Sequence, residues 1–192
     1  RRRRGLVPSR PVLEGLGAGA VLLATAMLSI AAVFRTASRA FDEEVRAGLM
    51  NFAHAAAALV DGDLHRRLVS PEQEATQAYA AAIEPLRKVL DQASDLRFVY
   101  TVVLVQDQVH FVLDATPPGD ADGDGVEDHS ALMEPYEDAD PEMLATLRDG
   151  VARVTAEPYS DGWGTFISAF VPLRDSQRRQ IGILGADITL AR

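Results

Sequence analysis

The apolar and polar positions of the chain first follow a helical period. From Gly15 to Phe34 there are 20 consecutive residues without a charge. A helix of that length spans about 30 Å, which is the hydrocarbon thickness of a bilayer. Apolar residues then recur every three or four positions, as on one face of a helix. They are Phe41, Val45, Leu49, Phe52, Ala56 and Leu59. Together the two stretches predict one long helix that leaves a membrane and stops near Gly62.

A second helix is predicted from a capping box at Ser70. Serine at the N-cap is followed by proline at N1 and by Gln73 at N3, which is a common start of a helix. The helical pattern continues from Tyr79 to Leu90. Pro85 falls inside this pattern, so we expect it to bend or break the helix.

The second half of the chain changes to a strand pattern rich in β-branched and aromatic residues. The predicted strands are Arg97–Val105, Val109–Ala115, Val151–Thr155, Thr165–Leu173 and Gln180–Thr189. Residues 116–139 form a long acidic loop, and a short helix is expected from its cap at Asp140 to Gly150. Strands in adjacent pairs, with helices before and between them, predict an α+β domain on an antiparallel sheet.

Charge is distributed unevenly along the chain and predicts its topology. Residues 1–34 carry a net charge of +4, and residues 35–192 carry −13. The positive-inside rule therefore places residues 1–14 in the cytoplasm, a transmembrane helix at residues 15–35 and an extracytoplasmic domain at residues 36–192. The expected location is the inner (cytoplasmic) membrane. An outer domain this acidic repels phosphate backbones, so we expect no nucleic-acid partner.

A buried core helix and a cleaved signal peptide are the alternatives for the apolar segment. A core helix of that length without a polar face is unusual in a chain of 192 residues. A signal peptide has a shorter apolar region followed by a small-x-small cleavage site. Here the segment ends in Val33, Phe34 and Arg35, which is a poor cleavage site. We therefore expect a retained anchor.

The loop from Asp120 to Asp128 has the spacing of a calcium site. Carboxylates stand at positions 1, 3, 5 and 9, with glycine at position 6 and a backbone carbonyl available at position 7. The expected ligands are Asp120, Asp122, Asp124, Val126 and Asp128. Position 12, which should supply a bidentate glutamate, is Ala131. The alternative is a solvated acidic loop, because 10 of the residues from Asp120 to Glu142 are acidic.

No catalytic constellation is present, and the chain itself is not expected to be an enzyme. It contains no cysteine, no glycine-rich phosphate loop and no Gly-x-Ser-x-Gly sequence. None of the four histidines pairs with another at metal-ligand spacing, and each is expected at the surface. They are His54, His65, His110 and His129, of which the last flanks the calcium loop.

Several short sequences look like strand signatures of one family. They are Phe98-Val99-Tyr100-Thr101, Phe111-Val112-Leu113-Asp114-Ala115, Asp161-Gly162-Trp163-Gly164 leading into Ser168–Leu173, and Gly182–Ile188. In this order, after an N-terminal anchor, they resemble the Cache family, the extracytoplasmic PAS-like sensor domains of bacterial receptors. The resemblance covers residues 40–190. It implies a PAS-like antiparallel sheet, and beyond Arg192 a second membrane span and a cytoplasmic output domain.

The resemblance also implies a small-molecule ligand on the sheet beneath the long loop. Carried over by position, the expected ligand-binding residues are Tyr100, Asp114, Trp163 and Asp187. A carboxylate in an apolar strand needs a partner or solvent, and acids beside aromatic faces favour a ligand with an amine or another cation. The alternative is structural, with Tyr100 and Trp163 in the core and the two aspartates capping neighbouring loops.

These observations predict the ligand-sensing domain of a membrane-bound signal-transduction receptor. A histidine kinase is the expected output, with a diguanylate cyclase or a chemoreceptor signalling domain as alternatives. A homodimer is expected through the stripe Phe41, Val45, Leu49 and Phe52, although this stripe can instead pack on its own sheet. An anchored calcium-binding module with a structural or adhesive role is the rival from another class.

Overall fold

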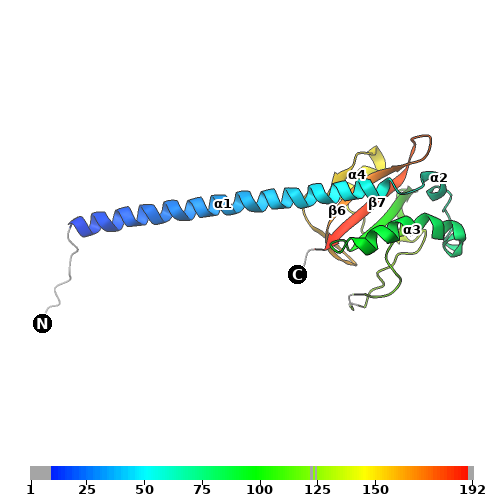
Figure 1. Cartoon of the computed structure of the whole chain (residues 1–192), viewed down its shortest axis with the longest axis horizontal. Helices are drawn as coiled ribbons and strands as arrows, with labels where there is room; N and C mark the ends of the chain where they lie inside the picture. The colour runs from blue at the N-terminus through cyan, green and yellow to red at the C-terminus, as the bar shows by residue number, and fades with distance from the viewer. Residues whose placement is uncertain (1–9, 122, 124, 190–192) are drawn as a thin grey trace. The chain divides into compact units, whose positions relative to one another are not determined.

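The computed structural model describes residues 10–121, 123 and 125–189. Figure 1 shows the helices and strands in chain order. The elements are α1 (Arg10–Ala57), α2 (Gly62–His65), η1 (Pro71–Ala75), α3 (Gln77–Gln92), β1 (Phe98–Val105), β2 (Gln108–Asp114), β3 (Pro135–Tyr136), α4 (Pro141–Asp149), β4 (Arg153–Val154), β5 (Tyr159–Asp161), β6 (Gly164–Arg174) and β7 (Gln180–Thr189). The chain divides into two compact units, one up to Glu44 and one from Val45 onward.

The described part of the first unit, from Arg10 onward, is helical and contains the long apolar segment. Helix α1 continues for 48 residues without a break, which corresponds to about 70 Å. By length and composition, its part from Leu22 to Ala57 can cross a membrane, and the most apolar window of that part is not buried at all. Leu22, Leu28 and Phe34 are each about 70% exposed. Such exposure is unlike that of a helix in the core of a globular protein.

The second unit is built on one antiparallel sheet. Its strand order is β3-β2-β1-β7-β6-β4, and β5 also pairs with β6. The two long hairpins predicted from the sequence, β1–β2 and β6–β7, lie side by side because β1 pairs with β7. The short strands β3 and β5, which the sequence pattern does not predict, extend β2 and β6. The predicted α+β class is confirmed.

Each face of the sheet has its own core. Leu49, Ala53 and Ala56 of α1 pack on one face together with α3 and residues such as Val99 and Leu184. The other face carries Phe98, Tyr100, Phe111, Phe166 and Phe170, and it is covered by Tyr136 and by Met143 of α4. Strand alternation therefore separates the two sets, as period 2 requires. The aromatic face is the one that holds the candidate site.

The region from Ser70 to Gln92 differs from the prediction of a single helix. The capping box at Ser70 is present, but it starts only the short 3-10 helix η1. Helix α3 begins at Gln77, because the Thr76 hydroxyl accepts the Tyr79 amide and caps a new first turn. Pro85 does not break α3. Proline has no N–H group, so the carbonyl of Ala81, four residues earlier, loses its helical hydrogen bond. Ala81 lies on the exposed side of the helix, where water can replace that hydrogen bond.

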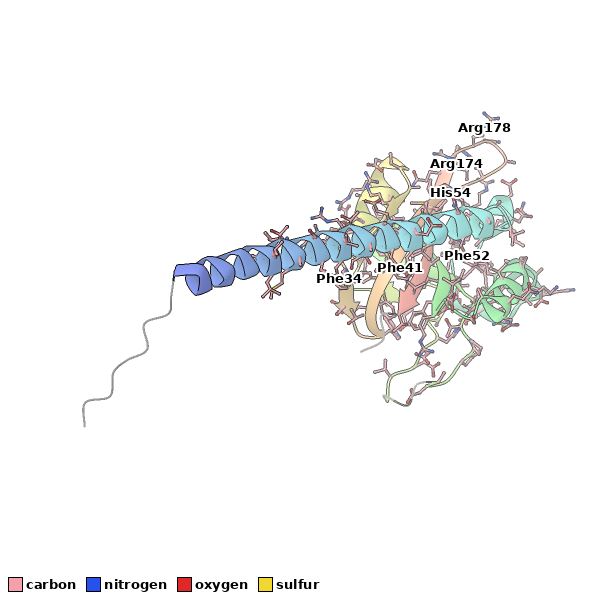
Figure 2. All side chains as sticks on the ribbon, turned by 60° about the vertical axis from the view of Figure 1, so that its left-hand side comes forward. Phe34, Phe41, Phe52, His54, Arg174 and Arg178 are labelled. Atoms are coloured by element: carbon pink, nitrogen blue, oxygen red, sulfur yellow. The ribbon has the colours of Figure 1, made fainter. Side chains whose placement is uncertain are left out.

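The middle of the apolar stripe on α1 packs in the core of the second unit. Leu49 is only 5% exposed and belongs to the core, whereas Phe41 is 70% exposed. Val45 and Phe52 are half-buried. Phe41 and Phe52 lie along α1 in Figure 2. Of the four residues predicted to form a dimer interface, Leu49 is therefore committed to the sheet.

Candidate ligand-binding site

A cavity lies on the aromatic face of the sheet, beneath the loop that joins β2 to α4. That segment, residues 116–139, contains the short strand β3 and is called the cap loop below. The cavity is lined by Phe98, Tyr100, Phe111, Asp114, Asp128, Ser130, Tyr136, Asp161, Trp163, Phe166 and Asp187. About 20 Å³ of it is open to the centre of a water molecule, so in this closed form it admits little more than a water. All four residues predicted to bind a ligand line this one cavity.

Register and a missing side chain set the floor of the cavity. Asp187 on β7 pairs with Phe98 on β1, and Tyr100 pairs with Gly185. A Cβ on Gly185 would lie 2.5 Å from Cζ of Tyr100. Because Gly185 has no side chain, the Tyr100 ring can cross β7 and bring its hydroxyl to within 3.5 Å of Asp187 Oδ1.

A β-bulge turns Asp114 towards the cavity. Thr101 pairs with Leu113 but Val102 pairs with Phe111, so Val112 has no partner in the register. Strict alternation from Phe111 would place Asp114 on the opposite face. The extra residue shifts the alternation by one position and aims the carboxylate at the cavity.

Aromatic rings surround the carboxylates. Phe111 is at the centre of one group, with ring centroids 5.5 Å from Tyr100, 5.1 Å from Tyr136 and 6.0 Å from Trp163. The Phe98 and Phe166 rings meet edge to face at 5.5 Å. Such rings form a rigid wall, and their faces carry the negative charge density that attracts a cation.

Asp187 is the most strongly perturbed carboxyl group of the site. It is 3% exposed, and this burial raises its pKa from 3.8 to about 8. The negative charges of Asp161 and Asp114 raise the pKa further, while hydrogen bonds to the Ser168 and Tyr100 hydroxyls partly offset the shift. At neutral pH the free domain therefore holds Asp187 in its neutral form.

The other three carboxylates fasten the cap loop. Asp114 accepts the backbone amides of Thr116 at 2.9 Å and Ser130 at 2.8 Å. Burial raises the pKa of Asp114, and these two amides oppose the shift. Asp161 accepts the Tyr136 hydroxyl at 2.6 Å. Asp128 forms an ion pair of 2.6 Å with Arg97. Each of these groups therefore has strong donors within the protein.

Two further residues, Trp163 and His129, hold the cap loop in place. The Trp163 indole nitrogen donates to the Glu127 carbonyl at 2.8 Å. The ring nitrogens of His129 lie 2.9 Å from the Thr116 carbonyl and 3.1 Å from a Glu74 carboxylate oxygen. Sequence reasoning did not assign these roles to Glu74 and His129, because their partners lie 13 residues or more away along the chain.

The calcium prediction depends on residues at the tip of the cap loop. Asp122 and Asp124 lie outside the described residues. Asp120 accepts the Gly123 and Gly125 amides, and the Asp128 oxygens face Arg97 and the Ala121 amide. Val126 is 40% exposed. Within the described residues no group of three or more histidine or acidic side chains is placed to hold a metal, so calcium binding stays a prediction.

The expectation that all four histidines lie at the surface is wrong for His129, whose side chain is 11% exposed, and for His65. Its side chain is 1% exposed and lies 2.9 Å from the Thr101 hydroxyl. Burial lowers its pKa to about 4, so it is neutral at physiological pH. The sequence of α2 gives no sign of this, because a helix of four residues has no clear buried face.

The fold matches that of solved sensor domains. No protein-family model matches the chain, and no curated protein matches it. The ligand-binding domain of the Campylobacter jejuni chemoreceptor Tlp3, solved with L-valine, aligns with a TM-score of 0.50 at 17% identity, over 80% of this chain and 56% of that one. The E. coli DcuS sensor domain aligns with a TM-score of 0.48 at 23% identity, over 75% of this chain and 90% of that one. The first match shows that the second unit has the fold of a PAS-like sensor domain.

The Gly185→Ala substitution should destabilise the domain by about 1–3 kcal/mol, because the new methyl group overlaps the Tyr100 ring. Urea unfolding measures the change. The same substitution in a Tyr100→Val background should cost clearly less, since the colliding ring is gone. An equal cost in both backgrounds would contradict this placement of Tyr100.

The Asp187→Asn substitution should flatten the pH dependence of stability. The pKa of Asp187 is raised from 3.8 to about 8 in the folded state. Its protonation therefore adds to the free energy of unfolding in full below about pH 4, and this addition is lost as the pH rises towards 8. The slope is about 1.4 kcal/mol per pH unit within that window. Denaturant midpoints at several pH values measure the slope, and Asp107→Asn at the exposed β1–β2 turn is the matched control. An unchanged slope in Asp187→Asn would show that the carboxyl group is ionised in the fold.

Proposed function

We propose that this chain is the ligand-sensing part of a membrane-anchored signalling receptor. The observation that carries the proposal is the carboxyl group of Asp187, buried beneath the cap loop without a charged partner. Burying such a group costs free energy, and strongly perturbed acids in closed cavities are typical of binding sites. The shared fold with a ligand-binding domain supports the same conclusion.

The membrane anchor rests on the N-terminal half of α1. An exposed apolar segment continues directly into the helix that packs on the sheet. The arginines before the segment favour a cytoplasmic N-terminus. We place the span at residues 15–35, in the inner membrane, with residues 36–192 on its extracytoplasmic side.

A chain of contacts supports α1 as the element that carries the signal. Asp187 is hydrogen-bonded to the Ser168 side chain. The Ser168 amide donates to the Thr155 hydroxyl at 3.1 Å, and Arg46 of α1 donates to the Thr155 and Ala156 carbonyls. Ionisation or movement of Asp187 would therefore act on residues that hold α1.

The output domain and the oligomer are further parts of the proposal. A histidine kinase is the expected output, with a diguanylate cyclase or a chemoreceptor signalling domain as alternatives. The chain spans 56% of the Tlp3 domain, and the whole receptor's activity stays a proposal. A homodimer would form along α1 through Phe41 and the exposed parts of Val45 and Phe52, since Leu49 is used by the sheet.

A small-molecule panel should contain compounds that raise the melting temperature of the full chain in detergent. A ligand at about 100 times its dissociation constant adds about 2.7 kcal/mol, which amounts to several degrees. The stabilisation should disappear in Asp187→Asn and persist in Asp107→Asn. The proposal fails if no compound class stabilises the chain, or if the stabilisation is the same in both variants.

The calcium-binding module is the second candidate, and the spacing of carboxylates from Asp120 to Asp128 favours it. We propose calcium as a ligand of the cap loop on this pattern. Millimolar calcium should then raise the melting temperature relative to EDTA by a few degrees, because an ion that binds only the folded state stabilises it. The effect should be absent in Asp120→Ala, with Asp138→Ala as control. No change with calcium would remove this candidate.

A further inference from the structure

The charged side chains that line the cavity are all acidic. Four carboxyl groups line it, those of Asp114, Asp128, Asp161 and Asp187. No lysine, arginine or histidine is among the described residues that line it. A zwitterionic or acidic ligand would therefore bring its own carboxylate against acids, without a cation to receive it.

The nearest basic side chains are already engaged. Arg97 contacts Asp128 at 2.6 Å and stacks on the Phe98 ring at 4.9 Å from its centroid. His129 faces the Thr116 carbonyl and the Glu74 carboxylate, and its Nδ1 lies 3.8 Å from Asp114 Oδ2. Turning either residue into the cavity would break the contacts that fasten the cap loop, so neither is an available partner for a ligand carboxylate.

The four carboxyl groups differ in the hydrogen-bond donors and charged partners that they contact. Asp114 accepts two backbone amides, Asp161 accepts the Trp163 amide and the Tyr136 hydroxyl, and Asp128 has its ion pair. In the described part of the chain, the donors that face Asp187 are two hydroxyls. Asp187 is thus the group that one additional positive charge would satisfy.

The surroundings of Asp187 suit a small organic cation. Phe98 is its register partner on β1, and Tyr100 brings an aromatic ring and a hydroxyl to the same point. A cation beside aromatic faces is attracted by the ring quadrupoles once it leaves water. The small free volume of the cavity, about 20 Å³, favours a compact group.

We infer that the site recognises a small organic monoamine that carries no carboxylate, with its ammonium group on Asp187. This inference rests on the proposed function and narrows its ligand class. It separates this chain from the Tlp3 domain of similar fold, which was solved with the amino acid L-valine. Proton release should accompany binding, because burial holds the pKa of Asp187 near 8 in the free domain.

Matched pairs of ligands with and without a carboxylate test the inference. Trp163 is the single tryptophan of the chain and lies in the cavity wall, so its fluorescence reports occupancy. Isobutylamine and ethylamine should bind saturably to the full chain in detergent. L-valine and L-alanine, which add only a carboxylate, should bind at least about tenfold more weakly, because like charges in a closed site repel. Isobutanol, the neutral isostere, should also bind more weakly.

The variants and the proton count make the outcomes distinct. Asp187→Asn should weaken amine binding by about a hundredfold, whereas Asp107→Asn should leave it unchanged. Calorimetry at neutral pH in two buffers of different ionisation enthalpy should show release of about one proton per amine in the unsubstituted chain and none in Asp187→Asn. Equal or tighter binding of L-valine, or of isobutanol, would overturn the inference while the sensor proposal stands. If no compound of any class binds, the sensor proposal itself fails.

Discussion

Asp187 holds a carboxyl group inside the sheet–loop interface, opposite Phe98 and 3.5 Å from the Tyr100 hydroxyl. Removing this group from water is costly, and the fold supplies two hydroxyls rather than a cation in compensation. Gly185 lacks a side chain, so the Tyr100 ring can reach across β7. Because the group is buried without a charged partner, Asp187 is neutral at physiological pH. A cation placed beside it would favour its ionised form.

The other three acids of the cavity connect the cap loop to the rest of the domain, although they have the same side chain as Asp187. Asp114 joins β2 to the cap loop by accepting the Ser130 amide. Asp128 joins the loop to the start of β1 through Arg97, and Asp161 joins it to the β5–β6 turn through Tyr136. Three acids thus hold the cap loop in place through donors within the protein, whereas Asp187 is buried without a charged partner.

Much of the fold could be predicted from the sequence, because the signals that determine it are local. The period-2 pattern located both long hairpins, and the caps at Asp140 and Gly150 located α4. The cavity was harder to predict from the sequence. Alternation alone places Asp114 on the wrong face, since the bulge at Val112 is visible only in the pairing of β1 with β2. The buried side chain of His65 contacts Thr101, 36 residues away along the chain. The four candidate residues were named from a family resemblance, and the partners that distinguish Asp187 from Asp114 are long-range contacts.

The ionisation state of Asp187 tests the account most directly. Carbon-13 NMR of labelled aspartate carboxyl groups, assigned with Asp187→Asn, would follow this group through a pH titration with and without a small amine. The account predicts a protonated Asp187 at neutral pH in the free chain, with its titration near pH 8, and an ionised Asp187 at the same pH when the amine is bound. An Asp187 that is already ionised at neutral pH in the free chain, with no change on addition of the amine, would contradict it.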